Sequence, residues 1–115
     1  MILVPLKRRI VFFAMTGHVI YKNLDQFNTA THSKKVIRYI RNYIGFKNIL
    51  ISDDLSMKSL KNNMKNNTIK AFEAGCNLAL HCNGKLNEMK IVAENSPLIS
   101  SFISKKTSQF YKILS

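Results

Sequence analysis

The chain has 115 residues, of which 46% are apolar. This length suits one compact domain, and the apolar content allows a core to form, which excludes a wholly disordered chain. The longest apolar stretches are too short and too interrupted to cross a bilayer, so we expect no membrane partner.

The chain is strongly basic, with 18 Lys and Arg against 6 Asp and Glu and a net charge of +12. Such a balance is typical of proteins that bind nucleic acid or anionic membranes. However, Lys, Asn and Ile together make up 39 of the 115 residues, a bias that AT-rich codons would produce. The basic residues are also scattered and do not form one block with interleaved aromatics. We therefore interpret the charge as compositional drift on solvated faces and expect no specific nucleic-acid partner.

Two features bear on the compartment. Apolar residues 1–6 precede the charges of Lys7, Arg8 and Arg9, which reverses the order of a secretory signal and predicts a cytoplasmic protein. Cys76 and Cys82 have neither a CxxC nor a zinc spacing, so we expect two small buried residues in a reducing compartment and no metal site.

Three short apolar runs are predicted to be strands. They are Ile10–Met15, Asn48–Ile51 and Asn77–Leu80, and each leads into polar residues. Their length and nearly continuous apolarity are typical of buried strands in a parallel sheet covered on both faces.

Helical patterns separate these runs. Ser33 is placed to cap a helix whose apolar face carries Val36, Ile37, Ile40 and Ile44, and Gly45 is placed to end it.

A second predicted helix holds Ile69, Ala71 and Phe72 and ends at Gly75, whereas the polar stretch Asn62–Asn67 is predicted to be a loop or a frayed helix start. Two more helices are expected, over Leu86–Glu94 and after Pro97. Strands and helices therefore alternate, which predicts an α/β fold made of βα units.

In parallel α/β folds, functional groups gather at the carboxyl ends of the strands. His18 follows the first run, Asp53 and Asp54 follow the second, and His81 and Asn83 follow the third. An aspartate there could attack a carbon centre, hold a metal or accept a phosphoryl group, or it could simply cap the next helix.

The remaining candidates are less specific. His18 fits a hydrogen-bonded loop histidine as well as a site residue, and His81 fits a core or supporting role. His32 is expected to be exposed to solvent. Met15 and Met57 are expected to serve packing more than chemistry.

Several ordered motifs together resemble a known family. They are Ala14–Tyr21 (AMTGHVIY), Ile44–Phe46 (IGF), Ile49–Met57 (ILISDDLSM), Glu73–Asn77 (EAGCN) and Leu80–Asn83 (LHCN). The sequence resembles glycoside hydrolase family 3, specifically the bacterial β-N-acetylhexosaminidases of peptidoglycan recycling. The resemblance covers residues 1 to about 83.

The resemblance implies a fold and a chemistry. It implies the C-terminal part of a (β/α)8 barrel, with about three βα units, in a single partial domain over 1–115 whose residues 84–115 form a C-terminal helical segment. It also implies retaining hydrolysis of terminal β-linked N-acetylglucosamine in muropeptides or glycans, without cofactor or metal. Asp53 would be the catalytic nucleophile, and His18 and Met57 would contact the sugar.

Departures from the family pattern qualify these expectations. A (β/α)8 barrel takes about 250 residues. The acid/base histidine of the family follows a Lys-His-Phe-Pro-Gly-His-Gly segment that is absent here, and His18, His32 and His81 have another context. We therefore expect a fragment that is inactive alone.

Three hypotheses follow. The chain is a remnant of a decaying hexosaminidase gene, or it assembles with a separate chain that carries the rest of the barrel. Alternatively, it is a small non-enzymatic basic α/β module that binds a metal or a polyanion.

Overall fold

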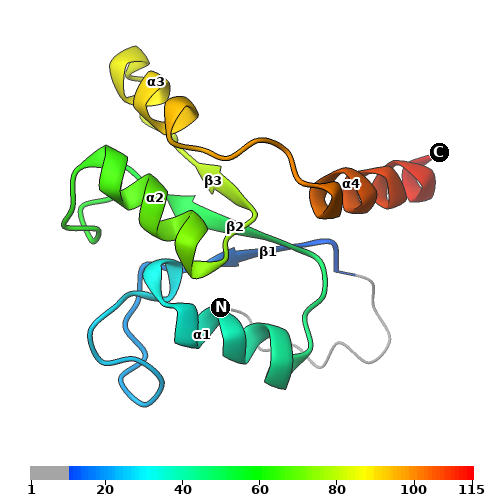
Figure 1. The fold of residues 1–115 in the computed structure, drawn as a ribbon, viewed down its shortest axis with the longest axis horizontal. Helices are drawn as coiled ribbons and strands as arrows, with labels where there is room; N and C mark the ends of the chain where they lie inside the picture. The colour runs from blue at the N-terminus through cyan, green and yellow to red at the C-terminus, as the bar shows by residue number, and fades with distance from the viewer. Residues whose placement is uncertain (1–10) are drawn as a thin grey trace.

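The computed structural model describes residues 11–115, which form a three-stranded parallel sheet in the order β1-β2-β3 (Figure 1). In the register of the first two strands, Phe13 lies opposite Ile49 and Thr16 lies opposite Ser52. The predicted α/β fold with parallel strands is confirmed. The strands are β1 (Phe13–Thr16), β2 (Ile49–Asp54) and β3 (Leu78–Leu80).

Helices follow each strand, as the alternating pattern predicts. A 3-10 turn precedes the first α-helix, whose last turn widens into a π-helix. The helical elements are η1 (Ala30–His32), α1 (Lys34–Tyr39), the π-helix η2 (Ile40–Ile44), α2 (Met64–Ala74), α3 (Leu86–Glu94) and α4 (Ser101–Leu114).

The ends of the first helix are set by the residues that the sequence singles out. The Ser33 side chain accepts a hydrogen bond from the main-chain N–H of Val36. Gly45 ends the helix with φ at 79°, a left-handed conformation that favours glycine. The chain therefore turns sharply into β2.

The core lies between the sheet and the helices α1 and α2. Leu50 of β2 packs there with residues from both helices, and burial of such side chains stabilises a fold by about 1.5–3 kcal/mol each. Gly75 has φ at 122°, and a Cβ atom there would lie 2.9 Å from Cγ2 of Ile37, so this close approach requires glycine. The buried apolar residues of the cluster are Ala30, Val36, Ile37, Ile40, Phe46, Leu50, Leu55, Leu60, Ala71, Ala74 and Cys76.

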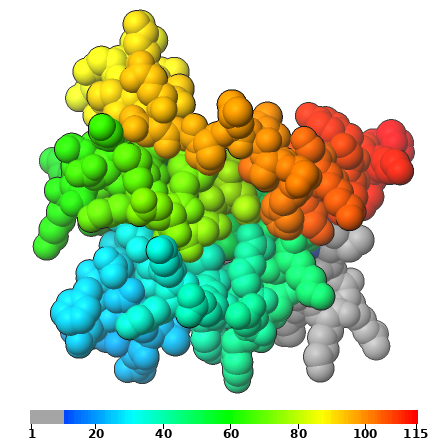
Figure 2. All heavy atoms as spheres, in the orientation of Figure 1, coloured from blue at the N-terminus to red at the C-terminus, as the bar shows by residue number. Residues whose placement is uncertain are grey.

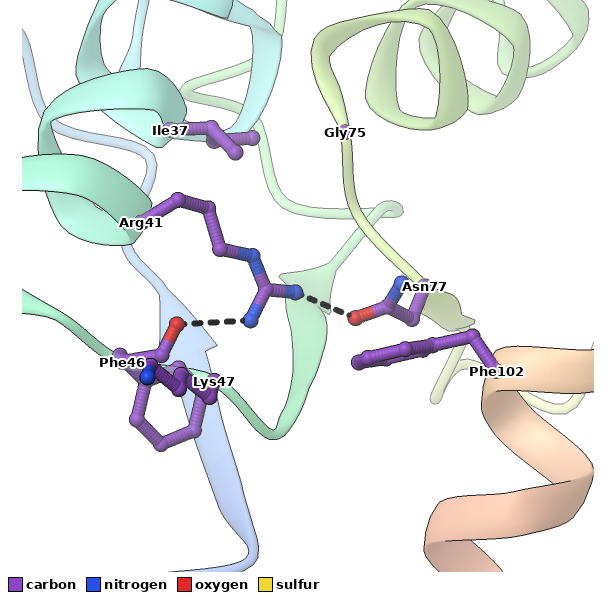
Figure 3. Close-up of a pocket in the computed structure, with 7 residues that line it drawn as sticks. All are labelled: Ile37, Arg41, Phe46, Lys47, Gly75, Asn77 and Phe102. Carbon is purple, nitrogen blue, oxygen red and sulfur yellow. Dashed lines mark hydrogen bonds between the residues drawn. The ribbon is translucent and has the colours of Figure 1, made fainter.

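Arg41 joins the starts of β2 and β3 (Figure 3). Its guanidinium donates to the carbonyl oxygens of Phe46 and Asn48 at 3.0 and 2.6 Å, and to Oδ1 of Asn77 at 2.8 Å. The Phe46 and Phe102 rings lie 5.6 and 5.7 Å from the guanidinium carbon. Burial lowers the pKa of Arg41. An open pocket of about 480 Å³ is lined by Ile37, Arg41, Phe46, Lys47, Gly75, Asn77 and Phe102.

The C-terminal helices are attached differently. Neither α3 nor α4 has a buried residue, and α3 stands out from the body of the molecule (Figures 1 and 2). The Phe110 ring holds α4 against the start of β1 through edge contacts with Phe12 and Phe13, with ring centroids 5.3 and 5.2 Å apart. These two helices fall within residues 84–115, the predicted helical segment, whose domain boundaries stay a prediction.

The structure corrects several expectations. Cys82 is exposed, whereas Cys76 is buried as predicted. Met15 and Met57 are 48% and 42% exposed and do not serve as core residues. His32 is half-buried and not solvent-exposed, because its Nε2 atom lies 3.0 Å from the carbonyl oxygen of Asn67.

The polar stretch 62–67 proves to be mostly helical. The Asn63 side chain accepts from the N–H of Asn66 and caps α2, so the helix begins at Met64. Residues 1–10, on which the cytoplasmic prediction rests, lie outside the described residues. Within 11–115, no helix has the length and apolarity that crossing a membrane requires.

Candidate active site

The parallel sheet brings the three predicted polar clusters to one edge. His18 follows β1, Asp53 and Asp54 end β2, and the segment 81–83 follows β3. Because parallel strands end on the same side of a sheet, these groups share the carboxyl edge. The two adjacent aspartates nevertheless have very different surroundings.

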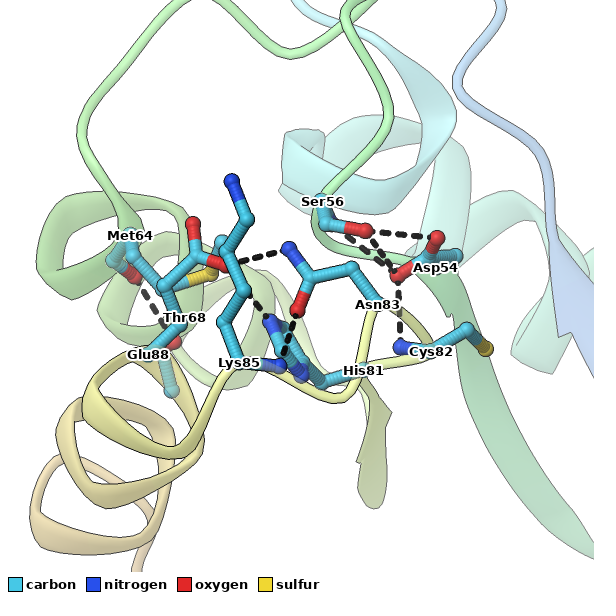
Figure 4. Close-up of polar contacts among 9 residues, drawn as sticks. All are labelled: Asp54, Ser56, Met64, Thr68, His81, Cys82, Asn83, Lys85 and Glu88. Atoms are coloured by element: carbon cyan, nitrogen blue, oxygen red, sulfur yellow. Dashed lines mark hydrogen bonds and ion pairs between the residues drawn. The ribbon is translucent and has the colours of Figure 1, made fainter.

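The Asp54 carboxylate is tied into the loop around it (Figure 4). Its Oδ1 atom accepts from the main-chain N–H groups of Ser56 and Cys82, each at 3.0 Å. The Ser56 hydroxyl lies 2.7 Å from Oδ2 and 2.8 Å from Oδ1. Burial alone would raise the pKa of Asp54, but the hydrogen bonds from Ser56 and Cys82 outweigh it and lower the pKa. Asp54 therefore joins the ends of β2 and β3.

The Asp53 carboxylate is far less engaged. One of its oxygens accepts the main-chain N–H of Asp54 at 2.8 Å, and it forms no ion pair with any residue in the described part of the chain. Strand alternation places Asp53 on the same side as Ile51, opposite Leu50 and Ser52, which are buried. The half-buried Asp53 carboxylate thus retains free acceptor capacity on the sheet face that α1 and α2 do not cover.

At the carboxyl end of β2, side-chain hydrogen bonds replace the main-chain hydrogen bonds that join neighbouring strands, on the β3 side and on the β1 side. The pairing of β2 with β3 is irregular between Ile51 and Asp54. There, the buried Ser52 hydroxyl accepts the main-chain N–H of Leu80 at 3.0 Å. The N–H of Leu55 then donates to the carbonyl oxygen of Leu80 at 2.8 Å. The sequence gives no signal for this role of Ser52, because it depends on a register shift.

On the β1 side, His18 is buried and both of its ring nitrogens have protein partners. Its Nε2 atom lies 2.7 Å from the main-chain carbonyl oxygen of Asp54, and its Nδ1 atom lies 2.8 Å from the Thr31 hydroxyl. The Thr31 hydroxyl also lies 2.9 Å from that of Thr16. The predicted sugar contact of His18 stays a prediction, as does that of Met57, whose exposed side chain lies beyond the β2 end.

His81 faces the helices instead of the edge occupied by Asp53. Its side chain is 5% exposed, and its Nε2 atom lies 3.3 Å from Oε2 of Glu88 on α3. Asn83 also donates to that oxygen. The Asn83 hydrogen bond is the main cause of a lowered pKa of Glu88. This contact attaches α3 to the β3 end, consistent with the supporting role considered for His81.

The described residues offer little for a metal ion. Within 11–115, no group of three or more His, Cys, Asp and Glu side chains is arranged to hold one. The two aspartates considered as a metal pair differ, because hydrogen bonds already occupy the Asp54 oxygens.

The sequence matches the model of the glycosyl hydrolase family 3 N-terminal domain over residues 9–110. This chain belongs to glycoside hydrolase family 3. The predicted family is thereby confirmed, and the match opposes an unrelated binding module. A β-hexosaminidase of Nitrosomonas eutropha is 37% identical over 71 residues, covering 60% of this chain and 20% of the relative. One from Psychromonas ingrahamii is 35% identical over 80 residues, covering 68% of this chain and 24% of the relative.

Solved structures agree on the fold. Zinc-bound CbsA from Thermotoga neapolitana is 26% identical with a TM-score of 0.65, over 78% of this chain and 20% of that one. A β-N-acetylhexosaminidase from Beutenbergia cavernae is 19% identical with a TM-score of 0.64, over 88% of this chain and 32% of that one. The fold is the predicted part of a (β/α)8 barrel. The chain spans about a fifth to a quarter of the length of the two curated relatives above.

Proposed function

We propose that this chain is the part of a retaining β-N-acetylhexosaminidase that carries the catalytic nucleophile, Asp53. The observation that supports it best is the contrast between the adjacent aspartates. Both carboxylate oxygens of Asp54 accept hydrogen bonds, whereas only one oxygen of Asp53 does, from a single N–H group. A nucleophile needs a free oxygen lone pair on an accessible face, and Asp53 has one.

The proposed reaction has two steps. In the first, an Asp53 oxygen attacks the anomeric carbon of a terminal β-linked N-acetylglucosamine. The glycosidic C–O bond breaks as an acid elsewhere in the barrel protonates the leaving oxygen. In the second step, the deprotonated acid takes a proton from a water molecule whose oxygen attacks the anomeric carbon, and the bond from that carbon to Asp53 breaks and releases the carboxylate. Met57, exposed beyond the β2 end, would contact the sugar at the rim.

The proposed substrate is a muropeptide or glycan that ends in N-acetylglucosamine, in the cytoplasm. The three βα units cannot surround a sugar, and no described histidine lies in the acid/base motif. The rest of the barrel, in the same polypeptide or in a separate chain, would supply the acid and most sugar contacts. Without that acid, leaving-group departure slows by about 10²–10⁴-fold. We therefore expect the 115-residue chain alone to be inactive.

The proposal is tested by grafting. Residues 11–83 replace the matching segment of a complete β-hexosaminidase of the family, and release from a chromogenic N-acetyl-β-glucosaminide is measured. We expect the graft to turn over, Asp53→Asn to abolish turnover, and Asp54→Asn to leave a folded enzyme with reduced activity. A fluorinated slow substrate should add its sugar mass to Asp53. Equal activity of the graft and its Asp53→Asn variant would refute the assignment.

The 115-residue chain is assayed beside the graft. Asp53-dependent release by the chain alone would show that the three βα units suffice, and would overturn the expected need for the rest of the barrel.

A further inference from the structure

The buried cluster beside the β2 end has a geometry that suits support better than sugar binding. We propose that His18 is a positioning residue that holds the Asp53–Asp54 segment in place and makes no contact with the substrate. This inference rests on the proposed function of Asp53, and it differs from the sugar contact that the family resemblance implies for His18.

The first argument is the hydrogen-bond inventory of the imidazole ring. A carbonyl oxygen can only accept, so the Nε2 atom, 2.7 Å from the Asp54 carbonyl oxygen, carries hydrogen. The Nδ1 atom lies 2.8 Å from the Thr31 hydroxyl, which can donate to it or accept from it. Both nitrogens are thus committed, and His18 is only 9% exposed. A sugar hydroxyl would have to displace a protein partner from a buried ring.

The second argument is that the cluster continues into the core. The Thr16 hydroxyl can donate to Thr31 at 2.9 Å, and Cys76 Sγ lies 3.8 Å from Oγ1 of Thr16 and from the carbonyl oxygen of Thr31. Burial raises the pKa of Cys76 to about 11, so its thiol keeps its hydrogen and donates. The cluster therefore links β1, η1 and Cys76, in the segment that leads into β3, to the β2 end.

The third argument is what His18 holds. The Asp54 carbonyl oxygen accepts from His18 Nε2 and also from the Met57 N–H at 3.2 Å, so it is the shared acceptor of a tight turn. The main-chain ladder between β1 and β2 ends at Thr16 and Ser52. Beyond that point, His18 supplies the link between the two segments, and Asp53 lies between this link and Ser52.

Two substitutions separate positioning from general structure. In His18→Gln, the side-chain amide nitrogen takes the place of Nε2 and can still donate to the Asp54 oxygen, whereas in His18→Asn the shorter amide reaches only the Nδ1 position. Amide hydrogen exchange of the 115-residue chain is measured for both variants, and for His18→Ala where it folds. We expect exchange at Leu55, Ser56 and Met57 to accelerate about tenfold in the Asn variant, and to stay near wild type in the Gln variant.

Two outcomes of the exchange experiment would overturn the proposal. One is equal loop protection in the Gln and Asn variants. The other is acceleration spread evenly over the core amides of α1 and α2, which would show a purely structural role.

The grafted enzyme gives an independent readout. A positioning role predicts that His18→Asn lowers kcat with KM nearly unchanged and that His18→Gln restores kcat. A raised KM in both variants would assign His18 to the sugar instead. Hydrogen exchange does not depend on turnover, so an inactive graft would count against the nucleophile and leave the positioning role still tested.

Discussion

The two ends of the described chain are stabilised in different ways. From β1 to α2, apolar side chains pack between the sheet and two helices, and buried polar groups such as Thr16, Thr31 and Ser52 have partners inside the protein. In α3 and α4, no residue is buried. Their attachments are fewer: in α3, Glu88 contacts His81 and Val92 packs against the core, and in α4, Phe110 contacts the start of β1 and Phe102 contacts Arg41.

This contrast teaches which part of the fold is self-sufficient. A βα unit whose helix packs on its own sheet can keep its core when neighbouring units are absent. Helices at the margin of a partial barrel depend on surfaces from other units, and here they expose large apolar residues such as Leu86 and Ile113. The first region also holds the β2 end, so the geometry around Asp53 is set within it.

Thiol labelling gives the largest expected effect. Cys76 is buried with its pKa raised to about 11, whereas Cys82 is exposed. At about pH 8.5, we expect an aromatic disulfide reagent to label Cys82 at least about a thousandfold faster, because Cys76 must wait for opening of the core. Cys76→Ala and Cys82→Ala chains identify each phase. Similar rates would mean that the first region is not a closed core.

The next effect compares two leucine truncations. Leu50→Ala removes a buried side chain and should lower the free energy of unfolding by about 2–5 kcal/mol. Leu86→Ala, at the exposed start of α3, should change it by less than about 0.5 kcal/mol. Urea unfolding measures both. Equal losses would show that α3 is packed as tightly as the sheet.

An intermediate effect should appear in acid. Hydrogen bonds from the Ser33 hydroxyl, the Phe27 N–H and the Asn28 side chain lower the pKa of Asp25 far below its ordinary value of 3.8. A lowered folded pKa adds stability that is present above pH 3.8 and is lost as pH falls through the folded pKa. Asp25→Asn should remove this pH dependence, and exposed Gln26→Ala should keep it. An unchanged acid profile in Asp25→Asn would contradict the assignment.

The smallest effect tests the attachment of α4. Phe110→Ala removes two edge-to-face contacts, which contribute about 0.5–1.5 kcal/mol each in aromatic pairs. We expect faster hydrogen exchange in α4 and at the start of β1, with α1 and α2 unaffected. Exposed Ile113→Ala is the control. Acceleration in α1 would make the two regions one cooperative unit.

Local signals in the sequence predict much of this fold. The apolar runs indicate all three strands, Ser33 and Gly45 mark the ends of the first helix, and the order of elements predicts parallel pairing. The strands and helix ends are predictable because each depends on neighbours within one turn or one strand. The family resemblance adds the partial barrel.

Features that depend on distant partners are harder to predict. The Asn63 cap starts α2 in a stretch without apolar periodicity. His32 is half-buried because Asn67, 35 residues later, accepts its hydrogen bond. Similarly, the aspartate pair is visible in the sequence, but the division between a bonded Asp54 and a freer Asp53 needs Cys82 from the next unit. The amino-acid composition does not indicate hydrogen bonds between residues that are far apart in the sequence.

Arg41 carries a consequence for tolerated substitutions. Its planar guanidinium reaches three acceptors at once while two rings flank it. Lysine keeps the positive charge but is a single point donor on a flexible stem, so it can satisfy only part of this set. Arg41→Lys, a conservative substitution by charge, would therefore weaken the link between the starts of β2 and β3. Substitutions of one aliphatic residue by another in the core should cost little stability.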